Sequence, residues 1–252
     1  MKEILDYRVS GNGHPVVFLH GFLESNSMWK HIELPSTIKQ ICIDLPGHGA
    51  SISHKVSSIS AMSDAVRTVV DSLNVSSYYV VGHSMGGYVA LELLKNDSRC
   101  EQLLLLNSNF WADSAQKKID RKRVANIVQE NKSLFLYEAI PNLFLNPEAS
   151  HVEVKELIEE ANLMSSEAIG QASIAMSNRK DYSSFVQEEN EHIFIVQGKE
   201  DSIVPLQMMR DSAESTGVSI QELEGCGHMA HIEKPLILAK IIMDWIKKKR
   251  KP

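Results

Sequence analysis

Short runs rich in apolar residues alternate with amphipathic segments over the first part of the chain, from about residue 4 to residue 110. Each run ends at glycine or polar positions, and the runs cover residues 16–19, 40–43, 78–81 and 103–106. Continuous runs of this length are typical of strands that are buried on both faces of a parallel sheet. Residues 59–73 have apolar positions three and four apart, which predicts a helix, and a second helix is predicted over 88–94. Strand alternating with helix predicts an α/β fold with a doubly wound, mostly parallel sheet.

The pattern changes between about Trp111 and Phe185, where strand-like runs give way to helical stretches. These stretches cover residues 117–131, 133–140, 152–164 and 166–176. Strand patterns return at 193–196 and 219–223, and residues 232–248 predict a last helix. Inserted helices at this place usually cover the ligand crevice at the carboxyl edge of the sheet. We therefore predict a core of residues 1–110 and 186–252, interrupted by a helical lid at 111–185.

Composition narrows the classes of function. The 252 residues carry a formal net charge of −6, which argues against a nucleic-acid partner. No apolar run approaches the length of a membrane span, and the first ten residues lack the apolar region of a secretory signal. The three cysteines have no framework spacing, so we expect free thiols and a cytoplasmic location. These features favour an ordinary globular protein with neither a nucleic-acid partner nor a membrane partner.

The most informative segment has the order Gly-His-Ser-Met-Gly-Gly at residues 82–87, between a predicted strand and a predicted helix. A serine on a strained turn between strand and helix stands clear of the sheet, so Ser84 is the candidate nucleophile. Gly82 and Gly86 lie where a side chain would crowd the turn. Gly87 allows the helix and the strand to pack closely.

A serine hydroxyl is a poor nucleophile without a base. Of the ten histidines, His228 lies in a glycine-rich turn that follows the last predicted strand, which makes it the candidate base. His231 is the alternative. His20 and His83 lie beside the candidate loops, and we expect both to have structural roles.

The base needs an acid that holds its tautomer. Asp201 follows the predicted strand at 193–196, and the adjacent Glu200 is the alternative acid. The acid could also follow the preceding predicted strand. That strand pattern ends at Leu106, Asn107 and Ser108, where no carboxylate is present, so Asp201 is favoured.

The order of these motifs resembles the α/β-hydrolase superfamily, and the resemblance covers essentially the whole chain apart from the predicted lid. The motifs are HGF at 20–22, DLPGHG at 44–49, GHSMGG at 82–87, GKEDSIVP at 198–205 and GCGHMAHIEKP at 225–235. The resemblance implies the triad order Ser84, Asp201, His228. It also implies an oxyanion hole made by the backbone amides of Met85 and Phe22.

The resemblance implies a serine hydrolase that cleaves a small or medium carboxylic ester, thioester or lactone through an acyl-enzyme at Ser84. Carbon–carbon bond hydrolases and lyases use the same triad, and some ligand-sensing signalling proteins keep it, so both remain alternatives. Epoxide hydrolases and haloalkane dehalogenases have an aspartate where Ser84 stands, which disfavours them. A similar lyase of menaquinone biosynthesis typically has an arginine where this chain has Tyr88.

The candidate substrate-binding residues are Trp111, Ile203 and Met229. The predicted lid contains Arg121, Arg123 and Arg179 but no arginine-rich stripe, so we expect a largely apolar substrate group. Neither metal-ligand spacing nor a nucleotide-binding glycine motif is present, and we expect no metal and no cofactor. The expected partner is a small-molecule, ester-like substrate, bound by a monomer or a homodimer.

Overall fold

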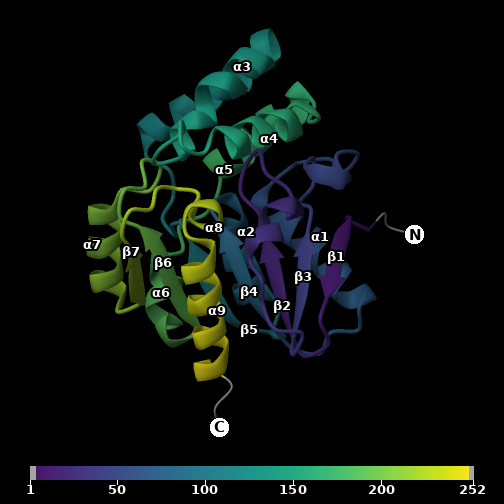
Figure 1. Cartoon of the computed structure of the whole chain (residues 1–252), viewed down its shortest axis with the longest axis vertical. Coiled ribbons are helices and arrows are strands. Elements are labelled where there is room, and N and C mark those ends of the chain that lie inside the picture. The colour runs from purple at the N-terminus through teal and green to yellow at the C-terminus, as the bar shows by residue number, and fades with distance from the viewer. Residues whose placement is uncertain (1–3, 250–252) are drawn as a thin grey trace.

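The computed structural model describes residues 4–249, and Figure 1 shows a central sheet with helices on both faces and more helices above one end. Seven strands form the sheet in the order β1-β3-β2-β4-β5-β6-β7. All neighbouring strands are parallel except β1 and β3, which are antiparallel. The strands are β1 (Tyr7–Ser10), β2 (His14–Leu19), β3 (Ile38–Ile43), β4 (Tyr78–His83), β5 (Cys100–Leu106), β6 (Ile193–Gly198) and β7 (Ser219–Leu223). The structure confirms the predicted doubly wound, mostly parallel sheet.

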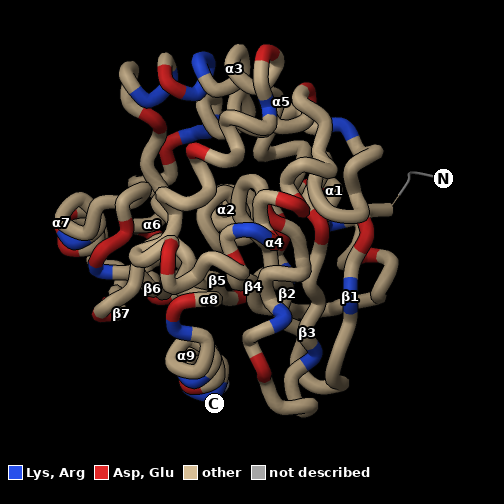
Figure 2. The backbone as a smooth tube through the Cα atoms, turned by 45° about the horizontal axis from the view of Figure 1, so that its top comes forward, with Lys and Arg blue, Asp and Glu red and all other residues tan. Residues whose placement is uncertain are grey.

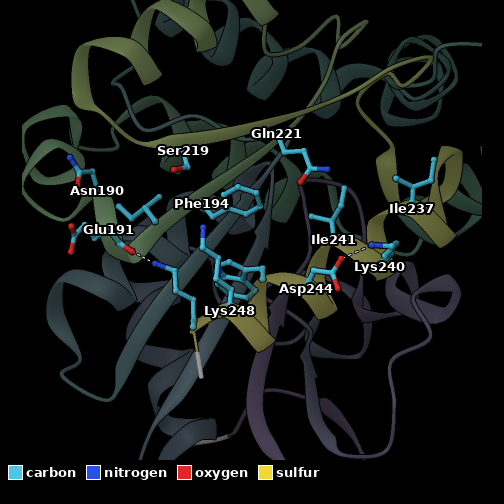
Figure 3. Close-up of a pocket in the computed structure, with 13 residues that line it drawn as sticks. Asn190, Glu191, Phe194, Ser219, Gln221, Ile237, Lys240, Ile241, Asp244 and Lys248 are labelled. Carbon is cyan, nitrogen blue, oxygen red and sulfur yellow. Dashed lines mark hydrogen bonds and ion pairs between the residues drawn. The ribbon is translucent and has the colours of Figure 1, made fainter. Parts of the chain in front are cut away.

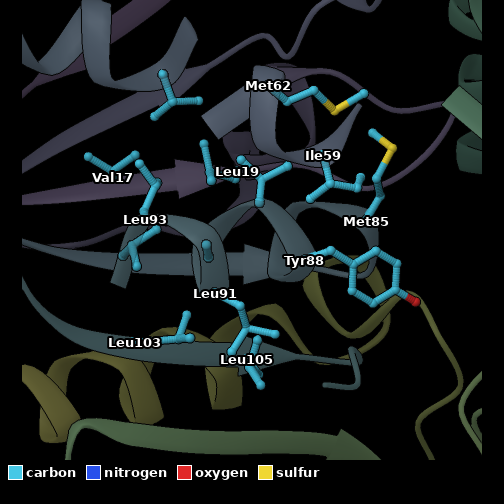
Figure 4. Packing of buried hydrophobic residues seen from close by; sticks show 14 of the residues in the cluster. Val17, Leu19, Ile59, Met62, Met85, Tyr88, Leu91, Leu93, Leu103 and Leu105 are labelled. Atoms are coloured by element: carbon cyan, nitrogen blue, oxygen red, sulfur yellow. The ribbon is translucent and has the colours of Figure 1, made fainter. Parts of the chain in front are cut away.

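Helices cover the two faces of the sheet and bury two apolar clusters. One face carries α1 (Ile59–Ser72), α2 (Met85–Asn96), α6 (Ser183–Glu188) and α7 (Leu206–Thr216). Figure 4 shows part of this face, where Leu19 and Leu105 of the strands lie near Met62 and Leu91 of the helices. The opposite face carries the short 3-10 helix η1 (Asn26–His31) and α9 (Pro235–Lys249).

A group of helices between β5 and β6 lies above the carboxyl ends of the strands (Figure 1). It consists of α3 (Ala115–Ala139), η3 (Pro141–Leu143), α4 (His151–Asn162) and α5 (Ser166–Ser177). Asn131 has non-helical φ and ψ angles of −151° and 80° inside α3, where the sequence predicted a break between two helices. These helices form a third apolar cluster, which also includes Leu23 and Met229 from loops of the core.

The short elements η2 (Gly49–Ser51), η4 (Asn190–His192) and α8 (Ala230–Glu233) complete the fold. Cys42, Cys100 and Cys226 are free thiols, as the sequence predicted. Within residues 4–249, no helix combines the length and the apolar character that a membrane span requires.

The strand order places the carboxyl ends of β2 and β4 at the point where the chain reverses direction across the sheet. From β2 the chain crosses to β3 on one side, and it then returns past β2 to β4. Loops that follow such strands separate outside the sheet and leave a crevice in which ligands bind. Phe22 follows β2 and Ser84 follows β4, so the fold brings both candidate residues to this crevice.

Candidate active site

Ser84 occupies a strained turn between β4 and α2, with φ 49° and ψ −115°. A side chain at Gly82 would lie 2.5 Å from the carbonyl oxygen of Gly86, and one at Gly86 would lie 2.5 Å from the carbonyl oxygen of Leu19. The predicted need for glycine at both positions is confirmed. A positive φ at a residue other than glycine costs about 1–3 kcal/mol and persists only where the surroundings enforce it.

Two hydrogen bonds hold this turn against the sheet. The Ser84 amide donates to the Leu106 carbonyl oxygen at 3.0 Å, and the Ser108 hydroxyl donates to the Ser84 carbonyl oxygen at 2.7 Å. A side chain at Gly87 would collide with Ser108, so the predicted role of Gly87 in close packing is also confirmed. The end of β5 therefore fixes the direction in which the Ser84 hydroxyl points.

Three residues from distant parts of the chain meet beside this turn. His228 Nε2 lies 3.0 Å from Ser84 Oγ, and His228 Nδ1 lies 2.9 Å from Asp201 Oδ2. The side chains of His228 and Asp201 are 3% and 0% exposed. Because the carboxylate only accepts, Nδ1 carries the proton and Nε2 is left to accept a proton from the Ser84 hydroxyl. The structure thus brings Ser84, His228 and Asp201 together as the sequence predicted.

Asp201 is ionised despite its burial. Oδ1 accepts hydrogen bonds from the amides of Ile203 at 2.8 Å and Val204 at 3.0 Å. Oδ2 accepts from Asn107 Nδ2 at 2.8 Å and from Gln197 Nε2 at 3.0 Å. Burial alone would raise the pKa of Asp201, but attraction to His228 and these hydrogen bonds lower it to about 2.

The two alternative residues have other partners. Glu200 Oε2 accepts from the Cys226 amide at 2.9 Å and braces the loop that precedes His228. His231 is fully buried, and its Nε2 lies 3.4 Å from Glu24 Oε1 rather than beside Ser84. The geometry therefore favours Asp201 and His228 over Glu200 and His231.

Two backbone amides near Ser84 are the candidates for the oxyanion hole, those of Met85 and Phe22. Met85 is the first residue of α2, so its amide has no acceptor within the helix and lies at the positive end of the helix dipole. The Phe22 amide follows β2, and the hydrogen bonds within residues 4–249 leave both amides without a backbone acceptor. Two free amides next to a nucleophile are suited to binding a developing oxyanion.

His20 orders the loop that carries Phe22. His20 Nδ1 donates to the Gly21 carbonyl oxygen at 2.8 Å, and Nε2 accepts from the Leu45 amide at 2.8 Å. One ring nitrogen thus donates and the other accepts, which requires the neutral imidazole. Burial lowers the pKa of His20 to about 4, in agreement with this state.

His83, the residue before Ser84, has the opposite protonation state from His20. Nδ1 lies 2.8 Å from Glu24 Oε2, and Nε2 lies 2.9 Å from the His228 carbonyl oxygen. Both partners only accept, so both ring nitrogens carry protons and His83 is an imidazolium. Burial opposes this charge, but Glu24 outweighs burial and raises the pKa of His83.

Glu24 is the residue that sequence reasoning missed here. Oε2 also accepts from the Gly21 amide at 2.6 Å, so one carboxylate joins the Phe22 loop to His83 and, through His83, to the backbone of His228. Burial would raise the pKa of Glu24, but the charge and the hydrogen bond of His83 lower it to about 2. Glu24 and His83 therefore form a buried ion pair behind the Ser84 turn.

Ligand atoms of Glu24, His83 and His231 lie within 4.8 Å of one another, so this cluster has the composition of a metal site. A metal needs an unprotonated ring nitrogen from each histidine. Both nitrogens of His83 already face acceptors, which fits the ion pair better than a metal ligand. Burial lowers the pKa of His231 to about 3, so His231 adds no second positive charge.

Glu24→Gln should destabilise the protein by about 3 kcal/mol at pH 6, because a buried charge loses its partner. The pKa of Glu24 falls from 4.5 to about 2, so its contribution is complete above pH 4.5 and is lost as the pH falls toward 2. The pKa of His83 rises above 6.5, so its contribution is complete below pH 6.5 and is lost as the pH rises through the raised value.

Urea unfolding of wild type and Glu24→Gln across the pH range measures this effect. The difference in unfolding free energy should be greatest between pH 4.5 and 6.5 and should narrow on both sides. A difference that stays constant from acid to alkaline pH would contradict the ion pair.

The loop that carries His228 is anchored to the inserted helices. The His228 amide donates to the Leu143 carbonyl oxygen at 3.1 Å. Glu233, which the sequence analysis did not single out, bridges the same two segments. Its Oε2 accepts from the Gly227 amide at 2.6 Å, and its Oε1 accepts from the Leu145 amide at 2.6 Å. The position of the candidate base thus depends on residues 143–145.

A cavity of about 220 Å³ opens onto Ser84 and His228. Ile203 and Met229, two of the three residues predicted to bind substrate, line it, and so does Phe22. Trp111 is not among its lining residues; instead, Trp111 packs edge-to-face on Phe110 and against the core of the sheet. The inserted helices supply much of the remaining lining, namely Lys117, Arg121, Val124, Phe135, Ala139, Leu143 and Met176.

A larger groove of about 610 Å³ lies between α9 and the strands β6 and β7 (Figure 3). Its strand residues, such as Ile193 and Ser219, belong to the amino ends of β6 and β7, whereas Ser84 follows the carboxyl end of β4. Within the groove Lys240 pairs with Asp244 at 2.6 Å, and the Lys249 ammonium donates to the Glu191 carbonyl oxygen. Its lining includes neither a nucleophile beside a base nor any residue of the Ser84 cavity. The smaller cavity therefore contains the reactive chemistry.

Comparison with known proteins agrees with this geometry. Residues 16–241 match the model of the alpha/beta hydrolase family. The chain is 25% identical to monoacylglycerol lipase abhd6-A of Xenopus laevis over 94% of this chain and 76% of the lipase. It is 26% identical to a thermophilic esterase from Thermogutta terrifontis, solved with malate bound, with a TM-score of 0.89 over 98% of this chain and 94% of the esterase.

A shorter match concerns a different reaction. The chain is 40% identical to 2-succinyl-6-hydroxy-2,4-cyclohexadiene-1-carboxylate synthase of Citrobacter koseri, but only over 77 residues. That segment covers 30% of this chain and 31% of the synthase.

Proposed function

The chain belongs to the alpha/beta hydrolase family, and we propose that it cleaves a small or medium carboxylic ester, thioester or lactone through an acyl-enzyme at Ser84. The observation that carries this proposal is the continuous contact from Ser84 Oγ through His228 to Asp201. In this proposal Ser84, His228 and Asp201 are the catalytic residues, and the amides of Phe22 and Met85 form the oxyanion hole. No step of this mechanism requires a metal or a cofactor.

The mechanism follows from the protonation states. His228 Nε2 takes the proton from Ser84 Oγ while the oxygen attacks the substrate carbonyl carbon. The tetrahedral oxyanion accepts hydrogen bonds from the two amides, and each such donor contributes about 3 kcal/mol in the transition state. His228 then protonates the leaving group, the acyl-enzyme forms, and water releases the acid by the same steps in reverse. Asp201 holds the imidazole tautomer and stabilises the transient imidazolium.

Ester cleavage is favoured over carbon–carbon cleavage by the extent of the similarities. The lipase and the esterase match nearly the whole chain, whereas the synthase matches a 77-residue segment. Tyr88 stands where the related lyase has an arginine, and the guanidinium of Arg179 lies 4.1 Å from the centre of the Tyr88 ring. Arg179 is 8% exposed, and protein groups already occupy both of its terminal nitrogens, Nη1 through Asp113 and Nη2 through Asn109 and the Trp111 carbonyl oxygen.

Residues 111–185 act as a lid in this proposal. They supply the wall of the cavity opposite Ser84, while the nucleophile, base, acid and oxyanion amides lie outside them. A cavity of about 220 Å³ is smaller than the roughly 300–1,000 Å³ of sites for drug-sized ligands, which suits a small substrate. The three free thiols fit a cytoplasmic location. In this proposal the protein is a monomer or a homodimer, and its partner is a small-molecule substrate.

A panel of p-nitrophenyl esters tests this function. We expect turnover of the acetate and butyrate, slower turnover of the octanoate, and stoichiometric labelling of Ser84 by a fluorophosphonate probe. Rapid labelling without turnover of any ester would favour a carbon–carbon hydrolase, a lyase or a ligand sensor that keeps the triad. Labelling at a residue other than Ser84 would overturn the proposal.

A further inference from the structure

Two cations of α3 face the cavity that contains Ser84. Lys117 and Arg121 lie one helical turn apart, and both line this cavity together with Ser84 and His228. We call them the α3 cation pair. Figure 2 shows Lys and Arg positions along α3 at the top of the molecule, with acidic positions between them.

The α3 cation pair has donors that protein groups leave unused. Arg121 Nε contacts Asp113 Oδ2 at 3.3 Å, and its two terminal nitrogens have no hydrogen-bond partner in the described part of the chain. Lys117 Nζ has neither a hydrogen bond nor an ion pair within residues 4–249. The Arg121 side chain is only 16% exposed, so its unused donors are partly removed from water, whereas Lys117 is exposed.

The nearby carboxylates do not neutralise the pair. Asp113 also binds Arg179 Nη1 at 2.6 Å, so a single carboxylate faces two guanidinium groups. Asp120 lies on the same helix and accepts a hydrogen bond from Gln116. Glu24 lines the cavity, but its charge is matched by the His83 imidazolium.

The positive charges of Lys117 and Arg121 repel each other when no anion lies between them. Partial burial lowers the pKa of Lys117, and the charge of Arg121 lowers it further. A carboxylate placed between the two side chains would accept hydrogen bonds from both and would relieve their repulsion. The planar guanidinium can bind a carboxylate with two parallel hydrogen bonds, and the lysine ammonium adds a point charge.

We propose that the α3 cation pair binds a carboxylate of the substrate, so that the preferred substrate is an ester that carries a second, free carboxylate. The inference rests on the proposed function, because it assigns a second group of the same substrate in the cavity that contains Ser84. The sequence analysis expected a largely apolar substrate group, and this inference proposes a group that carries a free carboxylate instead. The apolar lining at Val124, Phe135 and Leu143 contacts the carbon chain between the ester and the free carboxylate.

Two matched substrate pairs test the inference. On the acyl side, mono-p-nitrophenyl glutarate is compared with its terminal amide, which has the same shape without the charge. On the alcohol side, 4-acetoxybutanoate is compared with 4-acetoxybutanamide. Wild type should prefer the carboxylate in at least one pair, mainly through KM, and the preference should decline as salt is added.

Lys117→Met should lower the ratio of kcat/KM for carboxylate over amide by about 10- to 100-fold, which corresponds to the loss of one charge-assisted hydrogen bond. Arg121→Met should act in the same direction. Lys118→Met is the matched control, because Lys118 neighbours the pair on α3 but does not line the cavity. Lys118→Met should leave the ratio unchanged.

Binding of glutarate, measured by titration calorimetry against neutral glutaramide, separates this inference from the proposed function. Glutarate binding that weakens in Lys117→Met supports the carboxylate site even if no ester is turned over. Ester turnover that depends on Ser84, without a carboxylate preference in either pair and without glutarate binding, would overturn the site and leave the proposed function standing. A preference that Lys117→Met and Arg121→Met both leave unchanged would also overturn it.

Discussion

Ser84→Ala is expected to lower kcat for p-nitrophenyl butyrate by about 10⁶-fold, the size of the effect in serine hydrolases that lose their nucleophile. Without the hydroxyl, His228 Nε2 has no proton to accept and no acyl-enzyme forms. The amides of Phe22 and Met85 remain, so hydrolysis above the rate in water persists at a low level. KM should change little, because the cavity keeps its shape.

Steady-state kinetics with Ser202→Ala as the control measures this effect. Ser202 is next to Asp201, and its hydroxyl donates to the Asn142 carbonyl oxygen at 2.9 Å, away from the reaction centre. Ser202→Ala should retain nearly full activity. If Ser84→Ala kept a tenth or more of wild-type activity, the acyl-enzyme mechanism would have to be abandoned.

Asp201→Asn is expected to lower kcat by about 10⁴-fold with little change in fold. The new amide nitrogen donates toward His228 Nδ1, which forces the proton onto Nε2. The imidazole then presents a donor to Ser84 Oγ, 3.0 Å away, and cannot act as its base.

Glu200→Gln provides a matched control from the neighbouring residue. A glutamine oxygen can still accept from the Cys226 amide, which Glu200 contacts at 2.9 Å, so we expect less than about a tenfold loss of kcat. Parallel kinetics of the two variants, with circular dichroism to verify folding, decides between the acids. If Glu200→Gln lowered kcat far more than Asp201→Asn did, the acid would be Glu200 rather than Asp201.

Most of the strands that the sequence predicted are largely buried on both faces, whereas β7 was also predicted although it is partly exposed. Residues 78–83 are buried without exception, so their apolar run signals a strand directly. Tyr7–Ser10 was missed because β1 lies at the edge of the sheet and is largely exposed, which leaves no apolar run. Helix α7 was missed because Met209 and Ala213 are its only buried apolar residues.

The candidate site could be predicted where local turn chemistry marks it. Ser84 and His228 lie among glycines whose spacing the chemistry requires, so both motifs can be recognised from the sequence alone. Glu24 and Asn107 act through partners 59 and 94 residues away in the chain, and no local pattern records those contacts. Trp111 was predicted to bind substrate but packs against the core. An aromatic residue that follows a strand can turn toward the core or toward a crevice, and the sequence does not distinguish the two.

The hydrogen bonds between the His228 loop and residues 143–145 limit how this protein can diverge or be recombined. A relative's helices could replace most of the insertion and carry a new specificity with them. The short stretch around Leu143 and Leu145 lies in the middle of the insertion, but it supports the loop that carries the candidate base. The natural module boundaries for chimeras therefore lie on either side of this stretch, and we expect a deletion there to displace the candidate base as well as the cavity wall that Leu143 forms.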